Sequence, residues 1–160
     1  MISRRSRLWV SAACASLGIA ACGSASPGGS SGPATLTRIG PGEGALNIIV
    51  WAGYAEAGQD DPTVDWVTPF QQQTGCKVNA KIANTSDEMV ALMETGQYDG
   101  VSASGNATLR LMAGGTAAPI NVNLLTNYAD INPSLKDQPY NTYNGVHYGV
   151  PHGWGANLLM

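Results

Sequence analysis

The sequence predicts an α/β fold with a mostly parallel sheet flanked by helices, and two observations support this prediction. First, short β-branched runs alternate with segments of helical periodicity between residues 46 and 112. Second, the order strand–helix repeats three times in this stretch. That order implies right-handed crossovers, so the successive strands are expected to join one parallel sheet.

The first 21 residues have the composition of a signal peptide. Three arginines within the first seven residues precede a stretch, 8–21, that carries no charge. A helix needs about 20 apolar residues to cross a bilayer, so this stretch is too short to span one. Its length is that of a signal-peptide apolar region, and we expect residues 1–21 to be removed on export.

An aliphatic residue and two alanines precede Cys22 in the run Ile19-Ala20-Ala21-Cys22-Gly23. This run resembles the lipobox of bacterial lipoproteins, which implies cleavage before Cys22 and a diacylglyceryl group on its sulfur. The alternative is an ordinary secretory cleavage site with Cys22 incidental, but the preceding charges and the following linker favour lipidation. The protein is then expected to be extracytoplasmic, either periplasmic or on the outer face of the cytoplasmic membrane, and anchored by its lipid.

Residues 22–44 form a segment rich in Gly, Ser, Pro and Ala. Such a segment cannot bury enough apolar surface to offset the entropy of ordering, so we expect a disordered tether. Removal of the signal peptide leaves five Lys and Arg against eleven Asp and Glu, a formal charge of −6. No basic stripe remains, which argues against a nucleic-acid partner. With Cys22 acylated, only Cys76 keeps its thiol, so no intramolecular disulfide is available.

The folded part, residues 45–160, is predicted to open with a buried strand over 46–51. A helix is expected over 60–74 with Gly75 as its stop. Pro69 lies inside this segment, so either the helix proper begins close to Pro69 or it kinks there.

The next elements follow from local patterns. Residues 77–83 alternate between apolar and polar side chains and predict a second strand. The Thr-Ser-Asp-Glu run at 85–88 matches the capping box that begins many helices. A third short strand is expected over 98–102 and a third helix over 106–112, closed by two glycines.

The pattern weakens in the last quarter of the chain. Residues 120–139 are rich in Asn and Pro and predict turns with short helical pieces. A further strand is expected over 146–150, then a turn or bulge over 151–155, and a last apolar strand begins at 156–160. Because a stable domain seldom ends inside a buried strand, we expect residues 45–160 to be an incomplete lobe.

Four segments of the folded part, taken in order, form a set that covers it. They are Val50-Trp51-Ala52-Gly53-Tyr54, Phe70…Thr74-Gly75…Val78, Tyr98-Asp99-Gly100-Val101-Ser102-Ala103-Ser104 and Tyr148-Gly149-Val150-Pro151…Trp154-Gly155-Ala156. Together they resemble the N-terminal lobe of ABC-importer substrate-binding proteins, in the spermidine/putrescine-binding branch. Family members have two α/β lobes joined by crossover strands. The resemblance therefore implies a periplasmic-binding-protein-like lobe, with the second lobe missing from this chain.

The resemblance implies that Trp51 and Tyr54 bind the solute. In polyamine-binding relatives an aromatic pair at this place packs on the ligand's methylene and ammonium groups, and each cation–π contact contributes about 0.5–2 kcal/mol. Trp51 fits a core role equally well, whereas Gly53 lets the backbone approach a ligand and favours a ligand role for Tyr54. The relatives usually have a carboxylate immediately before this tyrosine, where this chain has Gly53. Glu56 either replaces that charge or faces solvent.

Ser104, Asn106 and Trp154 complete the candidate ligand-binding set. Ser104 matches the family's ligand-side serine, and Asn106 stands where an aromatic residue is common. Hydroxyl and amide groups at a helix N-terminus also suit an anion, and side-chain capping is an equal alternative for Ser104. Trp154 resembles a pocket-wall residue, with a core role as its alternative.

These features predict a substrate-binding lipoprotein of an ABC importer that binds a polyamine-like solute, such as putrescine or spermidine, and delivers it to a membrane permease. One alternative is the same fold with an anion, a metal complex or another small organic solute. A lesser alternative is a metal-dependent enzyme that uses His147 and His152, although no further metal ligands are evident and no hydrolase or nucleotide motif occurs. We expect a monomer with no cofactor, no bound metal and no catalytic residues.

Overall fold

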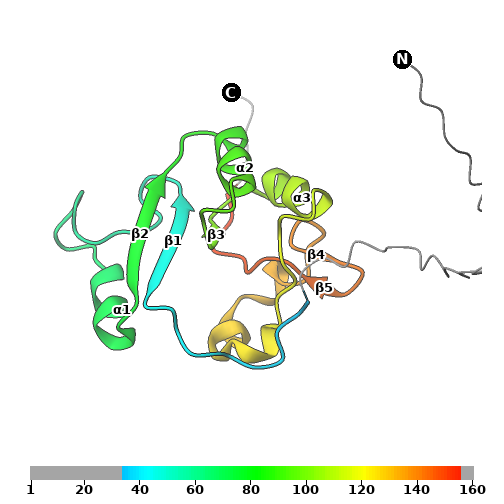
Figure 1. Ribbon diagram of the computed structural model, residues 1–160, viewed down its shortest axis with the longest axis horizontal. Coiled ribbons are helices and arrows are strands. Elements are labelled where there is room, and N and C mark those ends of the chain that lie inside the picture. Colours follow the sequence, from blue (N-terminus) through cyan, green and yellow to red (C-terminus); the bar gives the residue numbers. More distant parts are fainter. Residues whose placement is uncertain (1–33, 156–160) are drawn as a thin grey trace, which may run out of the picture. The chain divides into compact units, whose positions relative to one another are not determined.

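The computed structural model describes residues 34–155 (Figure 1). The predicted signal segment, Cys22, the tether up to residue 33 and the strand predicted at 156–160 lie outside the described residues. Residues 34–44 are exposed and contain neither helix nor strand. Within residues 34–155, no helix has both the length and the apolar character that crossing a bilayer needs.

The described residues contain a three-stranded parallel sheet. Its strands are β1 (Ala45–Val50), β2 (Lys77–Ile82) and β3 (Gly100–Val101), in the order β2-β1-β3. The three predicted strands and their parallel pairing are confirmed. β3 is shorter than predicted, since Asp99 Oδ2 accepts the Asn47 N–H at 2.7 Å in place of a backbone carbonyl.

The helix α2 (Ser86–Glu94) begins with the predicted capping box. Thr85 Oγ1 accepts the Glu88 N–H at 3.1 Å, and Glu88 Oε2 accepts the Asn84 N–H at 2.9 Å. The first contact satisfies an N–H group that the first helical turn leaves free, and the second fixes the residue just before the N-cap. The third predicted helix is also present as α3 (Gly105–Ala113).

The helix α1 (Val67–Thr74) begins later than predicted, so the expectation of a helix from residue 60 is wrong. The Glu56 carbonyl oxygen accepts the Trp66 and Val67 N–H groups, each at 3.1 Å, and this tertiary contact holds residues 60–66 in a loop. Pro69 is then the third residue of the helix, where its missing N–H costs nothing. Of the two alternatives for Pro69, the helix that begins close to it is confirmed.

The two faces of the sheet have different neighbours. On one face, α2 and α3 cover two buried clusters, formed by Ile49, Ala83 and Met89 and by Val90, Ala107 and Leu111. Val50 pairs with Ile82 across β1 and β2, so both side chains project from the other face. The helix α1 lies alongside β2, where Gln71 Oε1 accepts the Val78 N–H at 2.8 Å.

The last part of the described chain consists of short pieces, as predicted. Three 3₁₀ helices are followed by a two-stranded antiparallel hairpin, namely η1 (Val122–Leu124), η2 (Thr126–Asp130), η3 (Pro133–Leu135), β4 (Thr142–Tyr143) and β5 (Val146–His147). The strand predicted over 146–150 is therefore shorter, and it pairs within this hairpin. Asn144 and Gly145, with φ of 49° and 75°, form its turn. Adjacent positive φ angles at an Asn-Gly pair are typical of a tight hairpin.

Candidate functional site

The candidate site lies at the carboxyl edge of the parallel sheet. The chain leaves β1 at Val50, β2 at Ile82 and β3 at Val101, and parallel strands bring these three exits to the same edge. Open α/β sheets place their ligands at this edge, where the loops converge. The predicted site residues Trp51, Tyr54 and Ser104 all belong to these exit loops.

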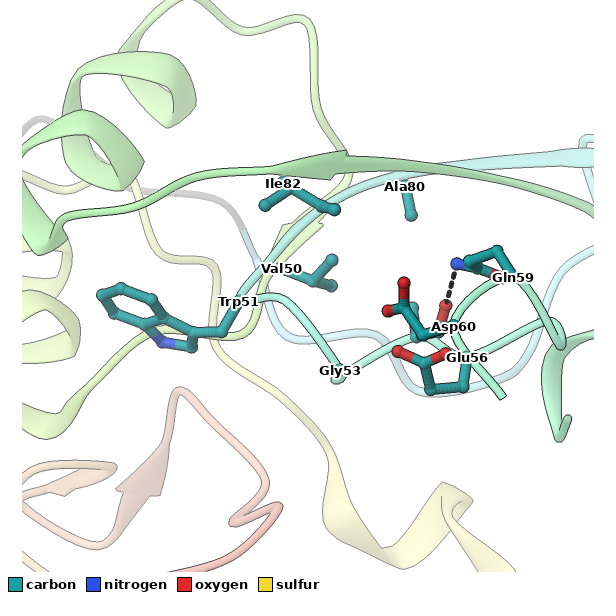
Figure 2. Close-up of a pocket in the computed structure, with 9 residues that line it drawn as sticks. Val50, Trp51, Gly53, Glu56, Gln59, Asp60, Ala80 and Ile82 are labelled. Carbon is teal, nitrogen blue, oxygen red and sulfur yellow. Dashed lines mark hydrogen bonds between the residues drawn. The ribbon is translucent and has the colours of Figure 1, made fainter. Parts of the chain in front are cut away.

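Trp51 directly follows β1 and is partly buried. It packs against the cluster of Ile49, Ala83 and Met89. Figure 2 shows its ring extending from the end of β1 away from the carboxylates of the neighbouring loop. The structure therefore gives Trp51 the contacts of a core residue, and its role in ligand binding stays a prediction.

Tyr54 is 45 % exposed and stands in a tight turn after β1. Its N–H donates to the Trp51 carbonyl oxygen at 3.1 Å, and Gly53 adopts a φ of +81° that favours glycine. The Tyr54 ring contacts the His152 ring, with centroids 4.9 Å apart and planes tilted by 55°. The turn thus presents an accessible aromatic ring, which packs against His152 from the far end of the described chain.

Ser104 links the starts of two helices. Its hydroxyl shares a 2.7 Å hydrogen bond with the Ser86 hydroxyl at the first residue of α2, and it donates to Asn106 Oδ1 at 2.6 Å. The Ser104 side chain accepts no capping hydrogen bond from α3, although its carbonyl oxygen accepts the Ala107 N–H at 2.9 Å. Side-chain capping, one of the two predicted roles of Ser104, is therefore not what this hydroxyl does.

The remaining predicted residues are spread apart. Trp154 is 78 % exposed, so it has neither a core position nor an enclosing pocket among the described residues. His147 lies in β5, with Nδ1 3.5 Å from an Asp137 carboxylate oxygen, whereas His152 lies against Tyr54. Within residues 34–155, no group of three or more His, Cys, Asp or Glu is arranged to hold a metal ion. The two histidines therefore do not form the site that the enzyme alternative requires.

Glu56 is the buried charged residue beside this edge. The residue is 6 % exposed, and its Oε2 atom has no hydrogen-bond donor among the described residues. It borders a cavity of about 110 Å³ between the 53–60 loop and the ends of β1 and β2 (Figure 2). The apolar side of this cavity is formed by Val50, Ala80 and Ile82, and the polar side by Glu56, Gln59 and Asp60.

The electrostatics of this cavity are unfavourable for a carboxylate. Burial raises the pKa of the Glu56 carboxyl above its ordinary value, and so do repulsion from the Asp60 carboxylate, a side-chain hydrogen bond with Asp60 and repulsion from Asp61, in that order. Asp61 is different, because hydrogen bonds from the Thr63 hydroxyl and N–H lower the pKa of its carboxyl. The carboxyls of Glu56, Asp60 and Asp61 thus repel one another, which favours the protonated form of Glu56.

Sequence reasoning noted Glu56 but missed Asp60 and Gln59. Asp60 was assigned to the start of a helix and Gln59 to no element, whereas both belong to the loop that closes the cavity. The only signal was the distance of Pro69 from the expected helix start, because a proline prefers the first helical turn.

No family model matches this sequence. The chain is 28 % identical over 127 residues to the spermidine/putrescine-binding periplasmic protein of Escherichia coli K12, a match that covers 72 % of this chain and 36 % of that protein. It is 29 % identical over 93 residues to the protein of the same name from Salmonella typhimurium, covering 56 % of this chain and 26 % of the relative. The chain thus spans about a third of the length of these curated relatives.

Solved structures agree on the fold. A putative spermidine/putrescine ABC transporter protein from Listeria monocytogenes superposes with a TM-score of 0.53 at 22 % identity, over 61 % of this chain and 29 % of that one. The spermidine/putrescine ABC transporter substrate-binding protein of Streptococcus pneumoniae superposes with a TM-score of 0.51 at 20 % identity, and the match covers 61 % of this chain and 28 % of that one. The chain is thus a distant sequence homologue of spermidine/putrescine-binding periplasmic proteins, and its described residues have the α/β fold of periplasmic-binding-protein-like ABC substrate-binding proteins.

Proposed function

We propose that this chain is the solute-binding part of an ABC importer lipoprotein, which binds a polyamine-like cation and delivers it to a membrane permease. The observation that carries the proposal is the half-exposed Tyr54 ring at the carboxyl edge, with the Glu56 carboxylate on the same loop. An aromatic face attracts an ammonium group, and a nearby carboxylate offsets the cost of removing that group from water. The relatives named for spermidine and putrescine support the choice of solute.

The proposal also includes the lipid on Cys22 and the tether of residues 22–44. A lipid-anchored binding protein stays near a permease, and a slack linker lets it reach that partner. Metabolic labelling with a radioactive fatty acid tests this part. Label in the wild type and none in Cys22→Ala supports the anchor, whereas equal label in both excludes it.

Calorimetry of the full chain with putrescine and spermidine tests the solute. We expect Tyr54→Ala to weaken binding about two- to thirtyfold, the range that one cation–π contact contributes. Tyr143→Ala is the matched control, because Tyr143 is also exposed but lies in the β4–β5 hairpin. No heat and no thermal shift at millimolar polyamine would reject the polyamine assignment.

A second candidate keeps the fold and changes the solute to an anion. The paired hydroxyls of Ser86 and Ser104 favour it, because they lie at the starts of α2 and α3, where free N–H groups attract negative charge. Mass spectrometry of solute that co-purifies with the chain separates the two candidates. A polyamine in the extract rejects the anion, and an organic acid or phosphate ester rejects the polyamine.

A further inference from the structure

The aromatic ring proposed above as a solute contact has an ionisable neighbour within the chain. The Tyr54 ring is half-exposed, and the ring of His152, an exposed residue, lies against it with the centroids 4.9 Å apart. The two residues are far apart along the chain, one in the turn after β1 and the other in the segment that follows β5. The proposed function gives no role to this imidazole, although it contacts the candidate ring.

The segment that carries His152 is fixed at a buried anchor. The Tyr148 N–H donates to the Asn141 carbonyl oxygen at 2.8 Å, and Asn141 is only 4 % exposed. A Cβ added to Gly149 would lie 3.6 Å from the Asn141 Cβ, so the backbone runs close to this residue. The ring of Pro151 then restricts φ immediately before His152. His152 therefore reaches Tyr54 from a segment that is packed against the start of the β4–β5 hairpin.

The charge environment of His152 differs from that of His147. His147 also lies beside a tyrosine ring, that of Tyr128, but its Nδ1 atom is 3.5 Å from an Asp137 carboxylate oxygen. Within residues 34–155, no carboxylate forms an ion pair with His152. A positive charge on His147 is thus balanced by its neighbour, whereas a positive charge on His152 acts on whatever binds at the Tyr54 ring.

The charge of an imidazole changes between about pH 5 and pH 8, and this change alters the Tyr54 ring as a binding surface. The neutral imidazole makes an ordinary aromatic contact, which leaves the rest of the half-exposed ring available. The imidazolium is itself a cation against the ring, so it competes for the negative π surface and repels a second cation. A polyamine keeps its charges throughout, because primary amines titrate at about pH 10. Protonation of His152 therefore opposes a cationic solute and favours an anionic one.

We infer that His152 is a specificity-determining residue of the Tyr54 site, whose neutral ring permits a cationic solute and whose protonated ring repels it. This inference rests on the proposed function for its solute, a polyamine-like cation. Tyr54 is the titratable side chain packed against His152, and the loop that follows adds the carboxyls of Glu56, Asp60 and Asp61. Protonation of these carboxyls also removes attraction for a cation. A substitution at position 152 separates the imidazole from the carboxyls, because it leaves their loop unchanged.

Calorimetry of the full chain with putrescine at about pH 8 and about pH 5.5 measures the effect, because the imidazole changes charge between these values. On acidification, we expect the wild-type affinity to fall at least about threefold more than that of His152→Gln, since two unit charges about 6 Å apart repel by roughly that factor even in water. His152→Lys should bind weakly at both pH values, because its ammonium group is charged at both. His147→Gln is the matched control, and its affinity should fall as much as that of the wild type.

NMR of the histidine rings gives a second reading on the wild-type chain. If a proton on His152 weakens solute binding, saturating putrescine must weaken the binding of that proton by the same factor. The midpoint of the His152 ring titration should therefore move to lower pH, by about half a pH unit for a threefold effect, while that of His147 stays in place. An unmoved His152 midpoint with putrescine bound overturns the inference. A melting curve of each variant checks that it is folded.

The failures of the two proposals differ. Putrescine binding whose pH dependence is the same in wild type and His152→Gln overturns the role of His152 and keeps the proposed function. Tighter putrescine binding at the lower pH in the wild type overturns that role as well. No binding of putrescine or spermidine at either pH, by the wild type or by His152→Gln, rejects the polyamine assignment and the inference with it.

Discussion

The two faces of the β2-β1-β3 sheet differ in what they bury. On the face under α2 and α3, Ile49 and Met89 are fully buried and contact other apolar side chains. On the opposite face, Val50 and Ile82 border a cavity that also holds the Glu56 carboxylate, and Ile82 remains 50 % exposed. Adjacent residues of one strand, Ile49 and Val50, thus point into environments of opposite character.

This difference indicates that one face of the sheet mainly stabilises the fold, whereas the other is available for binding. The face packed by helices gains free energy from apolar burial and has little room for a ligand. The other face leaves apolar area uncovered and buries the Glu56 carboxyl, whose Oε2 atom has no hydrogen-bond donor among residues 34–155, and both features are unfavourable for folding alone. Such local costs are typical of functional sites.

The largest expected effect comes from the packed face. Met89→Ala should lower the free energy of unfolding by about 2–5 kcal/mol, because a fully buried side chain leaves a cavity. Ile82→Ala on the other face should cost roughly 1 kcal/mol or less, because about half of that side chain already contacts water. Urea unfolding of both variants measures the contrast, and equal losses would show that the two faces contribute alike.

A smaller loss of stability is expected from a substitution in the turn that follows β1. Gly53→Ala should cost about 1–3 kcal/mol, because φ at this position is +81° and alanine is strained there. The cause is conformational, since the nearest atom to an added Cβ is at ordinary contact distance. Gly42→Ala is the control, because its Cβ would meet open space. A Gly53→Ala variant as stable as the control would mean that the turn relaxes freely.

The smallest expected effect is the change of stability with pH, and its direction tests the environment of Glu56. The raised pKa of Glu56 means that the folded chain holds this proton more tightly than the unfolded chain does. Its contribution to stability is therefore complete below the ordinary value of 4.5 and is lost as the pH rises through the raised value. Melting temperatures measured from pH 4.5 to neutrality should fall more steeply for the wild type than for Glu56→Gln. Parallel curves would contradict a perturbed carboxyl at this position.

The sequence by itself determined the elements whose signals are local. The strand at 46–51 follows from a β-branched run, and the start of α2 follows from the Thr85 and Glu88 capping box, whose partners are three residues apart. The parallel pairing of β1 with β2 and β3 follows from the alternation of strands and helices. These features depend on neighbours in the chain, so periodicity and capping rules are sufficient to predict them.

Only the tertiary structure decided where α1 begins and what surrounds Glu56. The start of α1 depends on the Glu56 carbonyl oxygen, which accepts the Trp66 and Val67 N–H groups. The burial of Glu56 depends on β2, whose Ala80 and Ile82 form the far wall of its cavity. Both outcomes come from contacts between segments that are separated along the chain, and the energy of such contacts does not appear in any local pattern. The sequence therefore left two alternatives for Glu56, either a residue that faces solvent or a replacement for the carboxylate that stands before Tyr54 in the relatives. The fold shows that Glu56 is buried.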